Sequence, residues 1–119
     1  MNITNIDQAA KTPYENPIFT GPQVTVQELL PVSDEFRINI VNFGRGVRNK
    51  LHFHSTEQVL IVTAGTGIVA TEAEESVVTV GDVIRIPAGV KHWHGATADS
   101  EFSHMYVMRK DSQITQVED

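Results

Sequence analysis

The sequence predicts an all-β domain folded as a sandwich or a barrel. Strand-like segments of about five residues recur along the chain, separated by turn signals at intervals of roughly 8–12 residues. Beyond residues 8–11, no stretch has helical periodicity. A chain of 119 residues suits a single domain, since the commonest domains have about 100–150 residues.

The first part of the chain is predicted to form a polar arm followed by two strands. Residues 1–17 are polar and interrupted by two prolines, which predicts an arm with at most one short strand. After a turn at residues 21–22, residues 24–30 alternate weakly as a strand. Residues 36–41 alternate more clearly, which indicates a half-buried strand.

The second part is predicted to alternate strands with glycine turns. Residues 59–63 form a continuous apolar run, as expected for a strand covered on both faces. Residues 64–67 hold two glycines and predict a tight turn. Further strands are predicted at 68–71, 76–80, 83–86 and 101–109. The barrel domain is therefore expected to span residues 18–110, followed by a loosely ordered polar tail at 111–119.

Composition and charge exclude several classes of partner and site. The net charge of −6 argues against nucleic acids and anionic membranes, because both require a basic face. The absence of cysteine excludes disulfides and thiolate ligands, so any metal must use nitrogen and oxygen donors. The first eleven residues lack the features of a signal peptide, and the longest apolar run is too short to span a bilayer. We expect a cytoplasmic protein.

The histidines are concentrated in two short segments and one following strand. Histidine is the commonest metal ligand and the side chain that titrates nearest neutrality. Confining all five copies to these segments indicates a site and not a scatter of surface imidazoles. They are His52, His54, His92, His94 and His104.

Strand geometry groups two of these histidines with a glutamine. Side chains alternate between faces along a strand, so His52, His54 and Gln58 share a face if the strand is continuous. Glu57 would then point away. A bulge or turn at residues 55–56 would reverse the assignment of the last two side chains.

Two glycine-bracketed motifs carry these histidines. The first has the pattern G-x5-H-x-H-x3-Q-x6-G over residues 46–65. The second has the pattern G-x5-P-x-G-x2-H over residues 81–92. In order and spacing they resemble the two signature motifs of the cupin superfamily. The resemblance implies the cupin jelly-roll barrel, or double-stranded β-helix, which suits the predicted strand pattern.

Two departures from the usual motifs narrow the resemblance. Gln58 replaces the usual glutamate ligand, and Ala96 stands where an asparagine is frequent. Together with the histidines that follow, this combination is similar to small manganese-dependent cupins that include bacterial hydroxynitrile lyases. We therefore predict that one divalent metal ion is bound by four side chains, His52, His54, Gln58 and His92.

The predicted ligands have a chemical consequence. Three imidazoles and one amide are all neutral, so the complex keeps one more positive charge than a site with a glutamate. That charge favours anionic ligands and increases the acidity of bound water. Manganese is the first expectation, but nitrogen and oxygen donors also suit iron, nickel and zinc. An octahedral ion would keep two positions for substrate or water.

His94 and His104 are predicted to act as acid/base groups beside the metal. His94 shares the parity of His92, and His104 begins an inward-facing set with Tyr106 and Met108. A proton acceptor of near-neutral pKa is useful beside open metal positions. The alternative for His104 is a hydrogen bond to a neighbouring strand only. Trp93 has the opposite parity and is expected in the core or in a subunit contact.

Three functions remain open at this point. The first is a metal-dependent lyase that uses Lewis-acid and histidine acid/base chemistry, as in a hydroxynitrile lyase. The second is a metal-dependent dioxygenase, which the absence of a carboxylate ligand makes less attractive. The third is a non-catalytic or uronate-isomerising cupin that binds a small ligand. In each case we expect a small-molecule partner and a homodimer or larger homo-oligomer.

Overall fold

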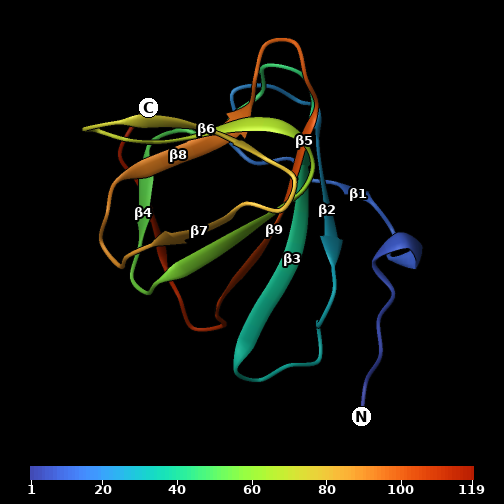
Figure 1. Ribbon diagram of the computed structural model, residues 1–119. Coiled ribbons are helices and arrows are strands. Elements are labelled where there is room, and N and C mark those ends of the chain that lie inside the picture. Colours follow the sequence, from blue (N-terminus) through green and yellow to red (C-terminus); the bar gives the residue numbers. More distant parts are fainter.

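Ten strands form one curled sheet in the computed structural model, which describes residues 1–119 (Figure 1). Along the sheet the strands follow the order β1-β2-β3-β9-β5-β8-β4-β10, while β6 and β7 also pair with β5. The predicted all-β jelly-roll class is confirmed. The strands are β1 (Thr12–Pro13), β2 (Val24–Glu28), β3 (Phe36–Phe43), β4 (His52–His54), β5 (Gln58–Thr71), β6 (Glu75–Thr79), β7 (Val83–Ile86), β8 (His92–Ala96), β9 (Phe102–Arg109) and β10 (Ile114–Gln116).

The long strand β5 joins the two halves of the barrel. Its first half pairs with β7 and β9, and its second half pairs with β6 and β8. The tight turn predicted at residues 64–67 is wrong, because β5 continues through it with a register shift between Val62 and Ala64. Gly65 has a φ of +70°, and a Cβ there would lie 1.8 Å from the carbonyl oxygen of Glu101. The glycine therefore allows a bulged strand to approach its neighbour closely.

The register of β3, β9 and β5 places matching residues in rows across the inner face. Met108 lies opposite both Arg37 and Gln58, and His104 lies opposite both Val41 and Val62. The inner face of β3 therefore carries its odd-numbered residues. The apolar even-numbered residues lie on the outer face, where Phe36 is 48% exposed.

The N-terminal arm covers part of this outer face. It contains one short strand, β1, and a 3-10 turn at Ile6–Gln8. The side-chain amide of Gln27 donates hydrogen bonds of 3.1 Å to the carbonyl oxygens of Ile6 and Ala9. Ile40, although on the outer face, is only 2% exposed and shares a surface hollow with these arm residues.

The C-terminal segment is ordered, so the prediction of a loose tail at 111–119 is wrong. Ile114 to Gln116 form β10, which pairs antiparallel with β4 and places Ile114 opposite His54. The Glu118 carboxylate accepts a hydrogen bond from the Leu51 backbone N–H and forms an ion pair with Arg48, both at 2.8 Å. The sequence analysis missed this pairing for two reasons. The partner strand lies about 60 residues earlier, and the mostly polar tail shows no alternation of apolar and polar residues that would indicate a strand.

Candidate metal centre

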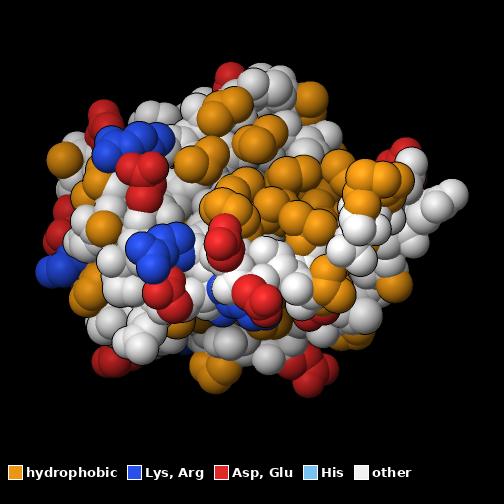
Figure 2. All heavy atoms as spheres, turned by 90° about the horizontal axis from the view of Figure 1, so that it is seen from below, with side chains coloured by type: hydrophobic (Ala, Val, Ile, Leu, Met, Phe, Trp, Pro, Cys, Tyr) orange, Lys and Arg blue, Asp and Glu red, His pale blue; other side chains and the backbone are white.

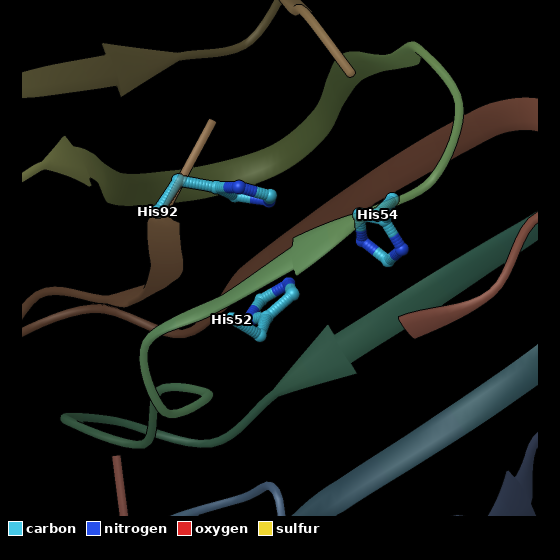
Figure 3. A group of neighbouring side chains, drawn as sticks. All are labelled: His52, His54 and His92. Carbon is cyan, nitrogen blue, oxygen red and sulfur yellow. The ribbon is translucent and has the colours of Figure 1, made fainter. Parts of the chain in front are cut away.

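Three histidines from two adjacent strands converge inside the barrel (Figure 3). His52 and His54 lie on β4, and their rings project from the same side of that strand. His92 opens β8 and pairs in register with His52. One ring nitrogen from each residue lies within 4.8 Å of the other two. This spacing suits three ligands around one ion.

Backbone carbonyl groups fix the orientation of two of these rings. The Nδ1 atom of His52 donates to the carbonyl oxygen of Lys50 at 2.6 Å, and Nδ1 of His92 donates to that of Val90 at 2.8 Å. Each ring is thereby held with Nε2 unprotonated and free to bind a cation. Nε2 of His92 and Nε2 of His54 are buried and have no hydrogen-bond partner. Buried polar atoms are nearly always paired, so these orphaned nitrogens fit a metal ion.

Gln58 lies in the same cavity as His52 and His54 and is 3% exposed. Its Oε1 atom is also buried without a partner, which fits a fourth, oxygen donor. The strand is interrupted at residues 55–57, yet Gln58 still faces inward and Glu57 still points outward to an ion pair with Arg85. The inward position follows from the pairing of Gln58 with Met108 and not from a continuous β4–β5 strand.

Burial keeps the three imidazoles neutral. Burial, together with the unfavourable interaction that a protonated ring would have with His92, lowers the pKa of His52 to about 3 and that of His54 to about 4. Burial also lowers the pKa of His92. Neutral imidazole is the form that binds metal, so no proton has to be displaced at neutral pH. The Arg37 guanidinium contributes to the lowered pKa of His54, so its positive charge acts on this cluster.

The other two histidines form a pair linked by a hydrogen bond. Nε2 of His104 lies 3.0 Å from Nδ1 of His94, so one ring donates and the other accepts. Burial lowers the pKa of His104 to about 4 and holds the pKa of His94 well below its usual value, so neither ring has the near-neutral pKa expected from the sequence. The His94 ring centre lies 5.6 Å from that of His92. His94 thus connects the three-histidine cluster to His104.

Asn49 holds His94 in place and was missed by the sequence analysis. Its Oδ1 atom accepts a 2.9 Å hydrogen bond from the His94 backbone N–H, and its Nδ2 atom lies 3.3 Å from Nδ1 of the His94 ring. Asn49 is 6% exposed. An asparagine just after a Gly-Arg-Gly turn gives no sequence signal for this role.

Trp93, expected in the core or at a subunit contact, is half-buried. The guanidinium carbon of Arg48 lies over the Trp93 ring, 4.6 Å from the centre of that ring.

A cavity of about 120 Å³ is lined by His52 and His54 of the three-histidine cluster and by both members of the histidine pair. All five histidines are at most 6% exposed, and none is visible on the face in Figure 2. An aromatic wall runs from Tyr14 through Phe19 to Phe43, with ring centres 5.0 and 5.8 Å apart. The first two rings come from the N-terminal segment, which the sequence analysis did not assign to the site.

Comparison with known proteins agrees with this geometry. Residues 39–108 match the model of a cupin domain. The chain is 38% identical over 73 residues to an (R)-mandelonitrile lyase from Granulicella tundricola, covering 59% of this chain and 54% of that protein. It is 28% identical over 101 residues to an acireductone dioxygenase from Hahella chejuensis, covering 82% of this chain and 50% of that protein. The chain thus spans about half the length of each of these relatives.

A solved structure extends the likeness to nearly the whole chain. A cupin-like protein from Thermotoga maritima superposes with a TM-score of 0.85 at 28% identity, covering 96% of this chain and 89% of that one. The one helical element is the three-residue turn Ile6–Gln8, so the structure contains no candidate membrane-spanning helix. Because the domain match takes in β4, β5, β8 and most of β9, the predicted family is confirmed, and this chain belongs to the cupin superfamily.

Proposed function

We propose that this protein is a metal-dependent lyase that cleaves or forms a carbon–carbon bond next to a hydroxyl group, as in the α-hydroxynitriles. The ligands would be the four predicted side chains His52, His54, Gln58 and His92. One observation carries the proposal: unpaired, buried donor atoms and a hydrogen-bonded histidine pair line the same cavity. When bound, a divalent ion supplies a Lewis acid that stabilises negative charge on a substrate oxygen.

The histidine pair would carry the proton. His94 is neutral at pH 7 and lines the cavity, so it can accept the proton of the substrate hydroxyl. The carbonyl then forms as the carbon–carbon bond to the nitrile breaks, and cyanide leaves with the bonding electron pair. His104 is hydrogen-bonded to His94 and can share the proton or return it to the leaving group. Asn49 fixes the backbone that carries His94.

Manganese is the ion proposed first, with iron, nickel and zinc as alternatives. All four donors are neutral, which preserves the positive charge of the ion for the substrate oxygen. Elemental analysis of protein prepared without added metal distinguishes the four.

A dioxygenase is the second candidate, because the similarity to an acireductone dioxygenase spans 82% of the chain. Against it stands the donor set, which lacks the carboxylate of the common non-haem iron triad. Oxygen uptake by the iron-loaded protein with catechol or flavonol substrates would favour this candidate over the lyase.

The proposal includes a cytoplasmic location and a homodimer or larger assembly. Exposed valines on β6, in the turn after it and on β7 would suit self-association; Val77, Val80 and Val83 are between 59% and 70% exposed. Sedimentation of the purified protein measures the assembly directly.

The decisive experiment compares mandelonitrile cleavage by the wild type and by His94→Ala. We expect the metal-loaded wild type to release benzaldehyde. His94→Ala should bind metal normally and turn over about 10²–10⁴-fold more slowly, the usual contribution of a positioned acid/base group. If His94→Ala loses metal together with activity, His94 is a ligand and the proposed proton transfer is wrong.

A further inference from the structure

The cavity has a charge opposite to that of the protein surface. The chain carries 15 acidic and 9 basic residues, yet none of the acidic residues lines the cavity. Arg37 is its one permanently charged lining residue. A divalent ion held by neutral donors would add two further positive charges. The cavity therefore favours negatively charged ligands over positively charged ones.

Arg37 reaches this cavity from the row that contains Gln58. Arg37 and Gln58 both lie opposite Met108 on the inner face, so two strand spacings, about 10 Å, separate their backbones. The guanidinium donates through Nη2 to the carbonyl oxygen of Lys110 at 2.9 Å. This bond holds the side chain in place and leaves other donors of the guanidinium fork available.

No acidic side chain forms an ion pair with the Arg37 guanidinium. The ion pairs of the protein are Arg48–Glu118, Arg85–Glu57 and Arg109–Asp111, and Arg37 is in none of them. Glu28, an exposed residue of β2 opposite Asn39, shares a surface hollow with Arg37 but lies outside the histidine-lined cavity and is not paired with Arg37. The Tyr106 hydroxyl accepts a 2.8 Å hydrogen bond from Asn39, so its own proton is free to be donated into the cavity.

We propose that Arg37 and Tyr106 bind a carboxylate of the substrate, which makes the substrate a hydroxy or oxo acid. The guanidinium matches a carboxylate in shape and charge, and the tyrosine adds a second type of donor. The substrate's hydroxyl or carbonyl oxygen then lies toward Gln58 and the histidines, while the aromatic wall contacts its apolar part. This inference rests on the proposed lyase and narrows its substrate class.

The experiment measures binding by calorimetry, with mandelate as the anionic probe and mandelamide as its neutral counterpart. Arg37→Gln should weaken mandelate binding by about ten- to hundredfold, the range for a lost hydrogen bond between charged partners. Tyr106→Phe should weaken it by up to about tenfold. Mandelamide binding should change less than about twofold in both variants, and bound metal should equal that of the wild type.

Arg45→Gln is the matched control, since it removes the same charge from an exposed turn outside the cavity. Equal mandelate affinity in the wild type, Arg37→Gln and Tyr106→Phe would overturn the carboxylate site. An equal loss for mandelamide, or an equal loss in Arg45→Gln, would also overturn it. Absence of mandelonitrile cleavage with selective loss of mandelate binding in Arg37→Gln would reject hydroxynitrile cleavage and support the carboxylate site.

Discussion

The two histidine groups differ in what their ring nitrogens contact. His52 and His92 direct Nδ1 to backbone carbonyl groups, which leaves Nε2 directed at the cluster. His94 and His104 instead contact each other through a 3.0 Å hydrogen bond. Both groups are buried and neutral, so burial alone does not distinguish them. The hydrogen-bond partner of each ring decides whether it is available to a cation or to a proton.

The largest expected effect is on metal affinity, and it distinguishes a metal ligand, His92, from a proton-transfer residue, His94. His92→Ala removes one of three converging nitrogens, and we expect metal affinity to fall at least about a hundredfold, with loss of turnover. His94→Ala should retain its metal. Equilibrium dialysis followed by elemental analysis measures both. Equal metal loss in the two variants would mean that the five histidines act as one site and that the distinction drawn here is wrong.

The next effect is on folding stability at low pH, and it tests whether the hydrogen-bonded pair His94 and His104 is neutral in the folded protein. The folded pKa of His104 is about 4, against 6.5 when unfolded, so the unfolded chain binds more protons between these values. The stability contribution is complete above pH 6.5 and is lost as pH falls toward 4. For this residue the loss reaches about 2 kcal/mol at pH 5 and about 3 kcal/mol at pH 4.

His104→Gln should remove this part of the pH dependence. Urea unfolding of chelator-treated wild type and variant at pH 7.5 and pH 5 makes the comparison without metal. The variant should lose about 2 kcal/mol less than the wild type between the two pH values. Parallel losses would show that His104 titrates normally in the folded protein, which would contradict its enclosed, neutral pairing with His94.

The smallest expected effect tests how the charge of the proposed fourth ligand, Gln58, changes metal affinity. Gln58→Glu places a carboxylate where the unpaired amide oxygen lies, so we expect metal to bind at least about tenfold more tightly. The added negative charge should also weaken binding of the mandelate anion. Gln58→Leu serves as the control, because it removes the donor oxygen without adding charge. Unchanged metal affinity in both variants would show that Gln58 is not a ligand.

Much of the fold and of the candidate metal site was predictable, because these features depend on residues that lie close together in the sequence. Alternation along single strands placed His52 and His54 on one face, and short spacings around glycines identified the family. Gln58 was placed correctly even though the assumed continuous strand is broken, because its face is set by β9. The turn at residues 64–67 was predicted wrongly, because glycine there permits close strand contact instead of reversing the chain.

The sequence by itself determined the strand pattern, the family and the candidate metal ligands, since each follows from the spacing of residues that are close together in the sequence. Only the tertiary structure decided that His104 bonds to His94, that Asn49 anchors His94, and that Arg37 enters the cavity. It also decided that the tail pairs with β4. These contacts join segments that lie 10 to about 70 residues apart, so they follow from strand order and register, which no local pattern encodes.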